Sequence, residues 1–441
     1  MPRPDALQPP DATVPRGGAF GAFRHRDFRL FWSGLVISHL GTWMQQVAQA
    51  WLLFSMTGSA AMVGLDGLFK TVPFVLVSLY AGTVVDRIDR RKTLIWVEAL
   101  NGVLPLIMGT LVVTGRLEVW HFYVNSVLSA SLGAFEAPCR QALLPHLVPR
   151  SDLMTAISLN SNVRKGSQMI GPAIGGILVA WVGAGWTFLI SAAGTSVLVG
   201  SLLLMRTSNV PSTAPARNAV KALTEGFRYV RGEPLILGLL VMQAAASLFG
   251  QYISMLVVFA NLVHKVGPEG LGMLQSAAGL GALGGSLFLA SRGDIRRKGR
   301  LLLGCGGVYA VALIAFSWSP TFLMGLAFLV VVGAADVMMG TAKQTMIQLS
   351  VRHDMVGRVM ALSSMSMRGV GPLGSFQTGL LTEFIGVQTA VAMGGVLTLT
   401  VMTAAFFLVP QLRTYGGGSG PSHDDEGQPL PAARPRRAVA D

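Results

Sequence analysis

Long apolar stretches alternate with short charged ones along most of the chain. A helix needs about 20 apolar residues to cross the hydrocarbon core of a bilayer. Twelve segments fit that requirement, with approximate limits of 28–55, 60–85, 93–114, 118–138, 154–182, 184–205, 234–262, 268–291, 300–318, 320–342, 356–384 and 386–410. The pattern predicts an all-α membrane protein with twelve transmembrane helices.

The one long internal connection divides these spans into two sets of six. Val220, Leu223, Phe227 and Val230 recur in it at helical spacing among basic residues, which predicts an amphipathic helix on the membrane surface. A flexible linker is the alternative. The predicted organisation is an N-terminal tail at 1–27, a six-helix bundle at 28–205, a linker at 206–233, a second six-helix bundle at 234–410 and a disordered tail at 411–441.

The two halves share short sequence elements. Gly133-Ala-Phe-Glu136 recurs as Gly333-Ala-Ala-Asp336, and Gly171-Pro172 recurs as Gly371-Pro372, both at an offset of 200 residues. Two parallel six-helix repeats are typical of transporters, in which the substrate site lies between the halves.

The composition supports a membrane protein. Hydrophobic residues make up 51% of the 441 residues and charged residues 12%, whereas an ordinary soluble domain carries about 25% charged residues. The net charge of +13 does not indicate nucleic-acid binding, because the cations lie in short clusters beside apolar spans. We expect the lipid bilayer, and no nucleic acid, as the partner of these surfaces.

The distribution of cations predicts the topology, since short cytoplasmic loops collect lysine and arginine. Of the 34 such residues, 28 fall in the two tails and in the connections on their side of the membrane. Arg116 and Lys265 fall on the opposite side, and the remaining four lie within spans. We expect a multi-pass protein of the cytoplasmic (inner) membrane with both termini in the cytoplasm.

Two motifs resemble the major facilitator superfamily. Residues 82–92 fit its loop signature Gly-x-x-x-Asp-Arg-x-Gly-Arg-Arg, with Asp89 at the second glycine. The matching residues are Gly82, Asp86, Arg87, Arg90 and Arg91. The second motif is similar to that of proton-coupled antiporters and comprises Gly171, Pro172, Gly175 and Gly176, with Ser167 in place of a preceding glycine.

Other stretches narrow the resemblance to bacterial efflux proteins related to the enterobactin and macrolide exporters. They are Gly41-Thr-Trp-Met-Gln-Gln, Thr57-Gly58-Ser59, Pro138-Cys-Arg140-Gln141-Ala142 and Gly226-Phe-Arg-Tyr-Val-Arg-Gly-Glu-Pro. The resemblance implies that the residues of the loop signature form a cytoplasmic gate, with Asp86 as its working residue. The alternative is that the basic residues only set the topology.

Acids inside predicted spans are candidates for proton coupling, because an ionised carboxylate is costly in the membrane. We rank Asp66 and Asp336 ahead of Glu136, and place Glu98 and Glu383 behind them because both lie near span ends. Lys70 follows Asp66, and Arg140 follows Glu136, at the i, i+4 spacing of a helical ion pair, so static structural pairs are the alternative.

Polar residues at helical spacing predict a substrate cavity, since a polar stripe must face protein or water. The candidates are Thr42, Gln45, Gln49, Asn125, Arg164, Gln243 and Gln251. Hydrogen bonds between helices are the alternative for each. Arg164 could instead bind an anionic group of the substrate or pair with an acid such as Glu136.

These features favour proton-coupled efflux of small amphipathic compounds by alternating access, with import or facilitated passage of a small solute as the alternative. The expected partners are a small-molecule substrate, protons and lipid, and we expect a monomer. The sequence has no metal-spaced histidines or cysteines and no Gly-x-x-x-x-Gly-Lys-Ser/Thr phosphate loop. We therefore expect no metal, no cofactor and no enzymatic activity.

Overall fold

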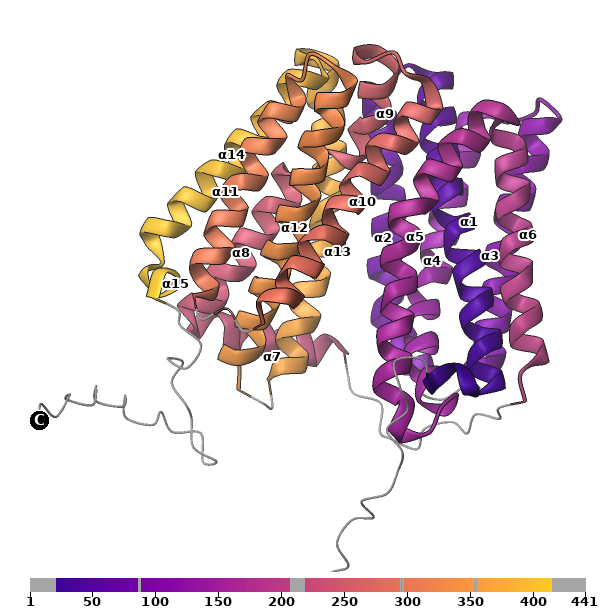
Figure 1. The fold of residues 1–441 in the computed structure, drawn as a ribbon, viewed down its shortest axis with the longest axis horizontal. Coiled ribbons are helices and arrows are strands. Elements are labelled where there is room, and N and C mark those ends of the chain that lie inside the picture. The colour runs from indigo at the N-terminus through magenta and orange to yellow at the C-terminus, as the bar shows by residue number, and fades with distance from the viewer. Residues whose placement is uncertain are drawn as a thin grey trace, which may run out of the picture.

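The computed structural model describes residues 21–85, 89–206, 219–293, 295, 297–352 and 355–414. Every regular element in these ranges is helical. Figure 1 shows two bundles side by side, one formed by the first half of the chain and one by the second.

The first half contains six long helices. Their bounds are α1 Arg26–Thr57, α2 Ala60–Val85, α3 Arg90–Val113, α4 Val119–Leu143, α5 Leu153–Trp181 and α6 Gly183–Leu204, with short 3-10 turns η1 Gly21–Arg24, η2 Leu144–His146 and η3 Arg150–Asp152. Helix α7, Ala219–Gly232, lies in the predicted linker. It packs against the second half, where the Arg358 guanidinium lies 3.1 Å from the Glu225 carboxylate.

The second half contains six long helical segments. The first is interrupted and consists of α8 Pro234–Phe249, η4 Ile253–Met255, α9 Leu256–Val258 and the π-helical turn η5 Phe259–Val263. At the interruption, the Tyr309 hydroxyl donates a hydrogen bond of 2.6 Å to the carbonyl oxygen of Gly250. The others are α10 Gly267–Arg292, α11 Lys298–Ser317, α12 Phe322–Ser350, α13 Val356–Ile385 and α14 Val387–Leu408, followed by α15 Pro410–Thr414.

Eight helices of the described chain are long and apolar enough to cross a membrane. Four other helices, α1, α4, α5 and α13, are equally long but less apolar, because each carries a series of polar residues. For these four, a membrane span remains a prediction from length and position in the bundle.

The internal repeat maps onto equivalent helices of the two bundles. Glu136 lies on α4 and Asp336 on α12, each the fourth long helix of its half. Pro172 lies on α5 and Pro372 on α13, each the fifth. The same repeat relates the two most extensive contacts between the halves in the described chain, since α5 packs on α10 and α2 packs on α13.

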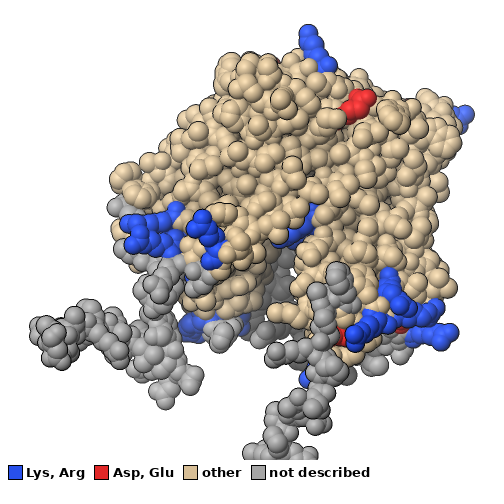
Figure 2. Space-filling model, in the orientation of Figure 1, with Lys and Arg blue, Asp and Glu red and all other residues tan. Residues whose placement is uncertain are grey.

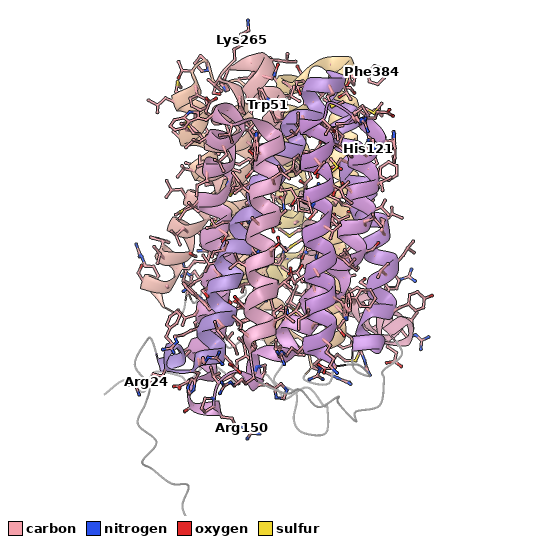
Figure 3. All side chains as sticks on the ribbon, turned by 90° about the vertical axis from the view of Figure 1, so that its right-hand side faces the viewer. Arg24, Trp51, His121, Arg150, Lys265 and Phe384 are labelled. Carbon is pink, nitrogen blue, oxygen red and sulfur yellow. The ribbon has the colours of Figure 1, made fainter. Side chains whose placement is uncertain are left out.

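Lysine and arginine gather at one end of the molecule, which we call the basic end (Figure 2). Arg24 and Arg150 lie there, whereas Lys265, His121 and Phe384 lie at the opposite, far end (Figure 3). This agrees with the charge asymmetry predicted from the sequence.

Among the described residues, clusters of buried apolar side chains join the halves only toward the far end. One cluster there contains Val47 and Phe188 from the first half together with Met255, Phe259 and Leu329 from the second. Toward the basic end each half has a cluster of its own. The two bundles are therefore sealed together at the far end and packed separately at the basic end.

Candidate functional site

Two adjacent cavities lie between the bundles, and Figure 2 shows the surface hollowed between the halves. Their volumes are about 530 and 610 Å³, within the range of small-molecule sites. The first cavity is lined mainly by α1, α2, α3, α4 and α13, and the second mainly by α1, α2, α5, α10 and α12. Lys70 and Gln251 line both.

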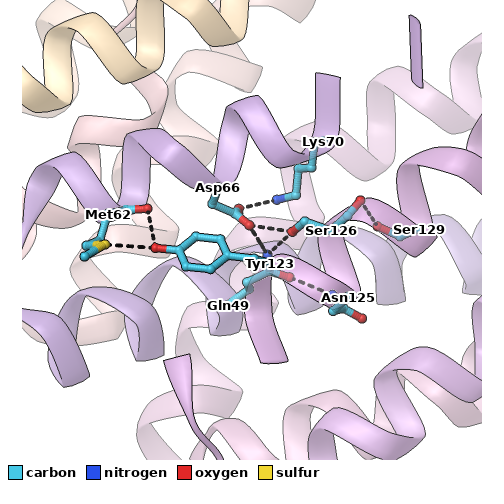
Figure 4. A network of polar contacts seen from close by, with 8 residues as sticks. All are labelled: Gln49, Met62, Asp66, Lys70, Tyr123, Asn125, Ser126 and Ser129. Atoms are coloured by element: carbon cyan, nitrogen blue, oxygen red, sulfur yellow. Dashed lines mark hydrogen bonds and ion pairs between the residues drawn. The ribbon is translucent and has the colours of Figure 1, made fainter. Parts of the chain in front are cut away.

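Asp66 is the centre of a hydrogen-bonded network in the first half (Figure 4). Its carboxylate accepts bonds from Lys70 at 2.7 Å, from the Gln49 amide at 2.9 and 3.0 Å, and from the Ser126 hydroxyl. Asn125 donates in turn to the Gln49 carbonyl oxygen at 3.1 Å. Asp66 is buried, and these donors compensate the loss of water around its carboxylate.

Glu136 forms a second ion pair at the predicted spacing. The Arg140 guanidinium donates to the Glu136 carboxylate at 2.6 Å, and the same nitrogen lies 3.0 Å from Nε2 of His39 on α1. All three residues line the first cavity. Glu98 on α3 lines this cavity as well and is 96% buried, since its exposed fraction is 4%.

Asp336 lies on α12 in the wall of the second cavity and is exposed to it. The structure gives it no hydrogen bond or ion pair with any residue of the described ranges. Tyr252 lines the same cavity. Asp336 is therefore an acid deep in the molecule that faces open space.

The predicted cavity residues divide into two groups. Thr42, Gln45 and Gln49 line the first cavity, Arg164 lines the second, and Gln251 lines both. Asn125 and Gln243 line neither. Gln243 instead exchanges two hydrogen bonds of 2.9 Å with Ser363 on α13.

The antiporter-like motif lies where α5 is wedged between α1 and the opposite half. Gly171 and Gly175 approach Trp43 and Met44 on α1. Gly176 faces the other way, where an added Cβ atom would lie 2.5 Å from the carbonyl oxygen of Pro268 and 3.0 Å from Cα of Gly272. Pro172 lines the second cavity, and its repeat counterpart Pro372 lines the first. Gly176, with Gly272 opposite it, thus permits a close contact of α5 with α10, whereas Gly171 and Gly175 permit one with α1.

The charged loop between α2 and α3 is partly described. Gly82 lies near the C-terminal end of α2, and Asp86 and Arg87 lie outside the described residues. Asp89 stands where the family signature has its second glycine, and its backbone is extended, with φ −65° and ψ 105°. Its side chain accepts hydrogen bonds from the N–H groups of Arg91 and Lys92. It therefore acts as the N-cap of α3.

Arg90 and Arg91 have different environments. The Arg91 guanidinium donates to the carbonyl oxygens of Leu202, Leu203 and Met205 at 2.6 to 3.2 Å, and so caps the C-terminal end of α6. Nε of Arg90 is buried and has no hydrogen-bond partner. The described part of the loop thus holds helix ends in place.

The two acids predicted to lie near span ends, Glu98 and Glu383, have different environments. Glu98 follows Leu94 by one helical turn, and both are buried, whereas Trp96 and Leu100 are exposed on the other face of α3. That spacing was a signal that Glu98 faces the interior. Glu383 lies at the far end and accepts hydrogen bonds from the Ser59 hydroxyl at 2.7 Å and the Ala61 N–H at 3.1 Å, across the two halves.

Comparisons with known proteins agree with this architecture. A model of the transmembrane secretion effector family, part of the major facilitator superfamily, matches residues 17–423. The enterobactin exporter EntS of Shigella flexneri is 28% identical over 401 residues, which cover 86% of this chain and 92% of that protein. The multidrug efflux pump Tap of Mycolicibacterium fortuitum is 26% identical over 386 residues, which cover 85% and 93%.

The staphyloferrin A transporter of Staphylococcus aureus is 23% identical over 390 residues, which cover 87% of this chain and 97% of that protein. Among solved structures, an inward-facing bacterial homologue of the lysosomal transporter Spinster is 18% identical with a TM-score of 0.65, covering 88% of this chain and 98% of that chain. A peptide transporter bound to alafosfalin is 11% identical with a TM-score of 0.72, covering 92% and 98%. These structures support the fold. Because the family model matches most of the chain, this protein belongs to the transmembrane secretion effector family, whose members are transporters rather than enzymes.

Proposed function

We propose that this protein is a proton-coupled exporter of small amphipathic compounds that works by alternating access in the cytoplasmic membrane. One observation carries the proposal. The cavities lie between two repeats that are sealed together at the far end and contain acids from both repeats, Asp66 and Glu136 in one and Asp336 in the other.

The arrangement of the seal supports alternating access. The glycine contact between α5 and α10 and the hydrogen bonds of Glu383 lie toward the far end. The basic end has no common apolar cluster among the described residues. Rocking the bundles about the cavities would open the far end and close the basic end, which is how repeat-built transporters move substrate.

The direction of transport and the orientation rest on two arguments. Cytoplasmic loops collect cations, so the basic end is the cytoplasmic end and both termini lie inside. The open side would then take up substrate from the cytoplasm. Two relatives are an enterobactin exporter and a multidrug efflux pump, and the Gly171–Gly176 motif resembles that of proton-coupled antiporters.

The lining supports an amphipathic substrate. Leu35, Phe74, Leu104 and Met367 line the first cavity beside the amides of Gln45 and Gln46. The wall thus combines apolar side chains with many polar ones, which suits a compound that has both apolar and polar parts.

Three acids are candidates for carrying the proton. Asp66 and Glu136 each have a cation within 2.7 Å. Asp336 has no such partner among the described residues and faces the cavity. We assign Asp336 the main role in proton coupling. We assign Asp66 a secondary role, in which its protonation breaks the ion pair with Lys70.

Uptake of fluorescent amphipathic compounds into everted membrane vesicles tests the proposed function. Vesicles that contain the protein should accumulate compounds such as ethidium or Hoechst 33342 when respiration acidifies their interior, and nigericin should abolish the accumulation. Vesicles without the protein are the control. Uptake only into right-side-out vesicles would indicate import, and movement that ignores nigericin would contradict proton coupling.

A further inference from the structure

Glu98 is a buried acid for which the described residues supply no hydrogen-bond or ion-pair partner. It lies on α3, its exposed fraction is 4%, and its side chain contributes to the wall of the first cavity. An ionised carboxylate in such a place costs several kcal/mol unless a cation or hydrogen-bond donors compensate it.

The other charged and titratable groups that face this part of the cavity supply no counter-ion for Glu98. Helix α4 contributes Glu136 and Arg140, α1 contributes His39, and α2 contributes Lys70. Arg140 is engaged by Glu136 at 2.6 Å and Lys70 by Asp66 at 2.7 Å. With His39 neutral, the two ion pairs cancel, and Glu98 is the one acid of this wall without a counter-ion among the described residues.

The wall around Glu98 suits the apolar body of an organic cation. Leu35, Phe74 and Leu104 line the same cavity, whose volume is about 530 Å³. A cation bound there would place its charge against Glu98 while its apolar groups contact these side chains. An anionic group would instead face Glu98, while the cations of this wall, Arg140 and Lys70, are already engaged by Glu136 and Asp66.

We propose that Glu98 binds the positively charged group of the substrate, so that the protein exports organic cations such as protonated amines or phosphonium compounds. The proposal rests on the proposed transport function and adds a substrate class to it. It makes Glu98 a specificity-determining residue rather than a structural one.

Binding of radiolabelled tetraphenylphosphonium to the purified full-length protein in nanodiscs tests the proposal. The wild type should bind it saturably, and Glu98→Gln should raise the Kd by about tenfold or more, because a charge-assisted contact is lost. Glu98→Asp should bind more tightly than Glu98→Gln. Glu118→Gln, which alters an exposed acid outside the cavity, should bind like the wild type.

A neutral probe of similar shape, triphenylphosphine oxide, distinguishes charge recognition from loss of the cavity. Its affinity should be weaker than that of tetraphenylphosphonium in the wild type and unchanged in Glu98→Gln. Three results would overturn the proposal. The wild type could bind both probes with equal affinity, Glu98→Gln could lose affinity for both equally, or tetraphenylphosphonium could show no saturable binding. Transport and binding test the two proposals separately. If Glu98→Gln still transports uncharged compounds in response to the proton gradient, the proposed transport function stands. The binding data then decide whether Glu98 recognises a cation.

Discussion

Gly176→Val should abolish substrate transport without preventing insertion into the membrane. The valine Cβ would lie 2.5 Å from the carbonyl oxygen of Pro268, and neither backbone can yield without moving α5 away from α10. Overpacking of this kind costs about 1–3 kcal/mol, and such a cost changes a two-state conformational equilibrium by about 5–150-fold. In the proposed mechanism this contact forms while the far end is closed, so the variant should favour the state open at that end.

A cysteine placed at Gln251, which lines both cavities, reports this shift. In a background that carries Cys139→Ser and Cys305→Ser, an impermeant maleimide added from outside should label it faster when Gly176→Val is present. Gly166→Val is the matched control on the same helix, since an added Cβ there meets no atom within 4 Å. Unchanged labelling with normal transport in Gly176→Val would show that this contact does not close the far end.

Asp336→Asn should uncouple transport from the proton gradient. The amide keeps the shape of the side chain but cannot exchange a proton, so substrate should still equilibrate across the membrane without being concentrated. In proteoliposomes, gradient-driven accumulation should fall to the level of empty liposomes, while exchange of labelled for unlabelled substrate continues. Asp336→Glu should recover part of the accumulation.

Glu269→Gln is the matched control for this measurement, because Glu269 lies in the first turn of α10 and lines neither cavity. It should leave both accumulation and exchange unchanged. Full accumulation by Asp336→Asn would remove Asp336 from the coupling mechanism and leave Asp66 and Glu136 as the candidates.

The local parts of the site could be predicted from sequence because they depend on helical spacing. Asp66 with Lys70 and Glu136 with Arg140 are each four residues apart, and both pairs form, at 2.7 and 2.6 Å. The repeat of Glu136 as Asp336 likewise places the two acids on equivalent helices. Such contacts need only one helix and its periodicity.

Contacts between helices were less accessible to sequence reasoning. Gln49 has the polar spacing of a cavity residue, but its amide is held by Asp66 and Ser126 from two other helices. Gln243 is similarly held by Ser363, 120 residues later in the chain. Nearness to a span end places Glu98 behind the other acids in the sequence-based ranking, and the packing of neighbouring helices buries it. These outcomes depend on which helices become neighbours, which a single sequence does not specify.

The most direct test of alternating access is a pair of distance measurements by pulsed electron spin resonance in nanodiscs. One spin-label pair, at Ser151 and Ser291, spans the basic end, and the other, at Ser55 and Thr389, spans the far end; all four residues are exposed. Addition of a transported compound together with a change of pH should shorten the first distance and lengthen the second within one population. Distances that stay fixed at both ends, or that lengthen together, would contradict an exporter in which the two repeats rock about a central cavity.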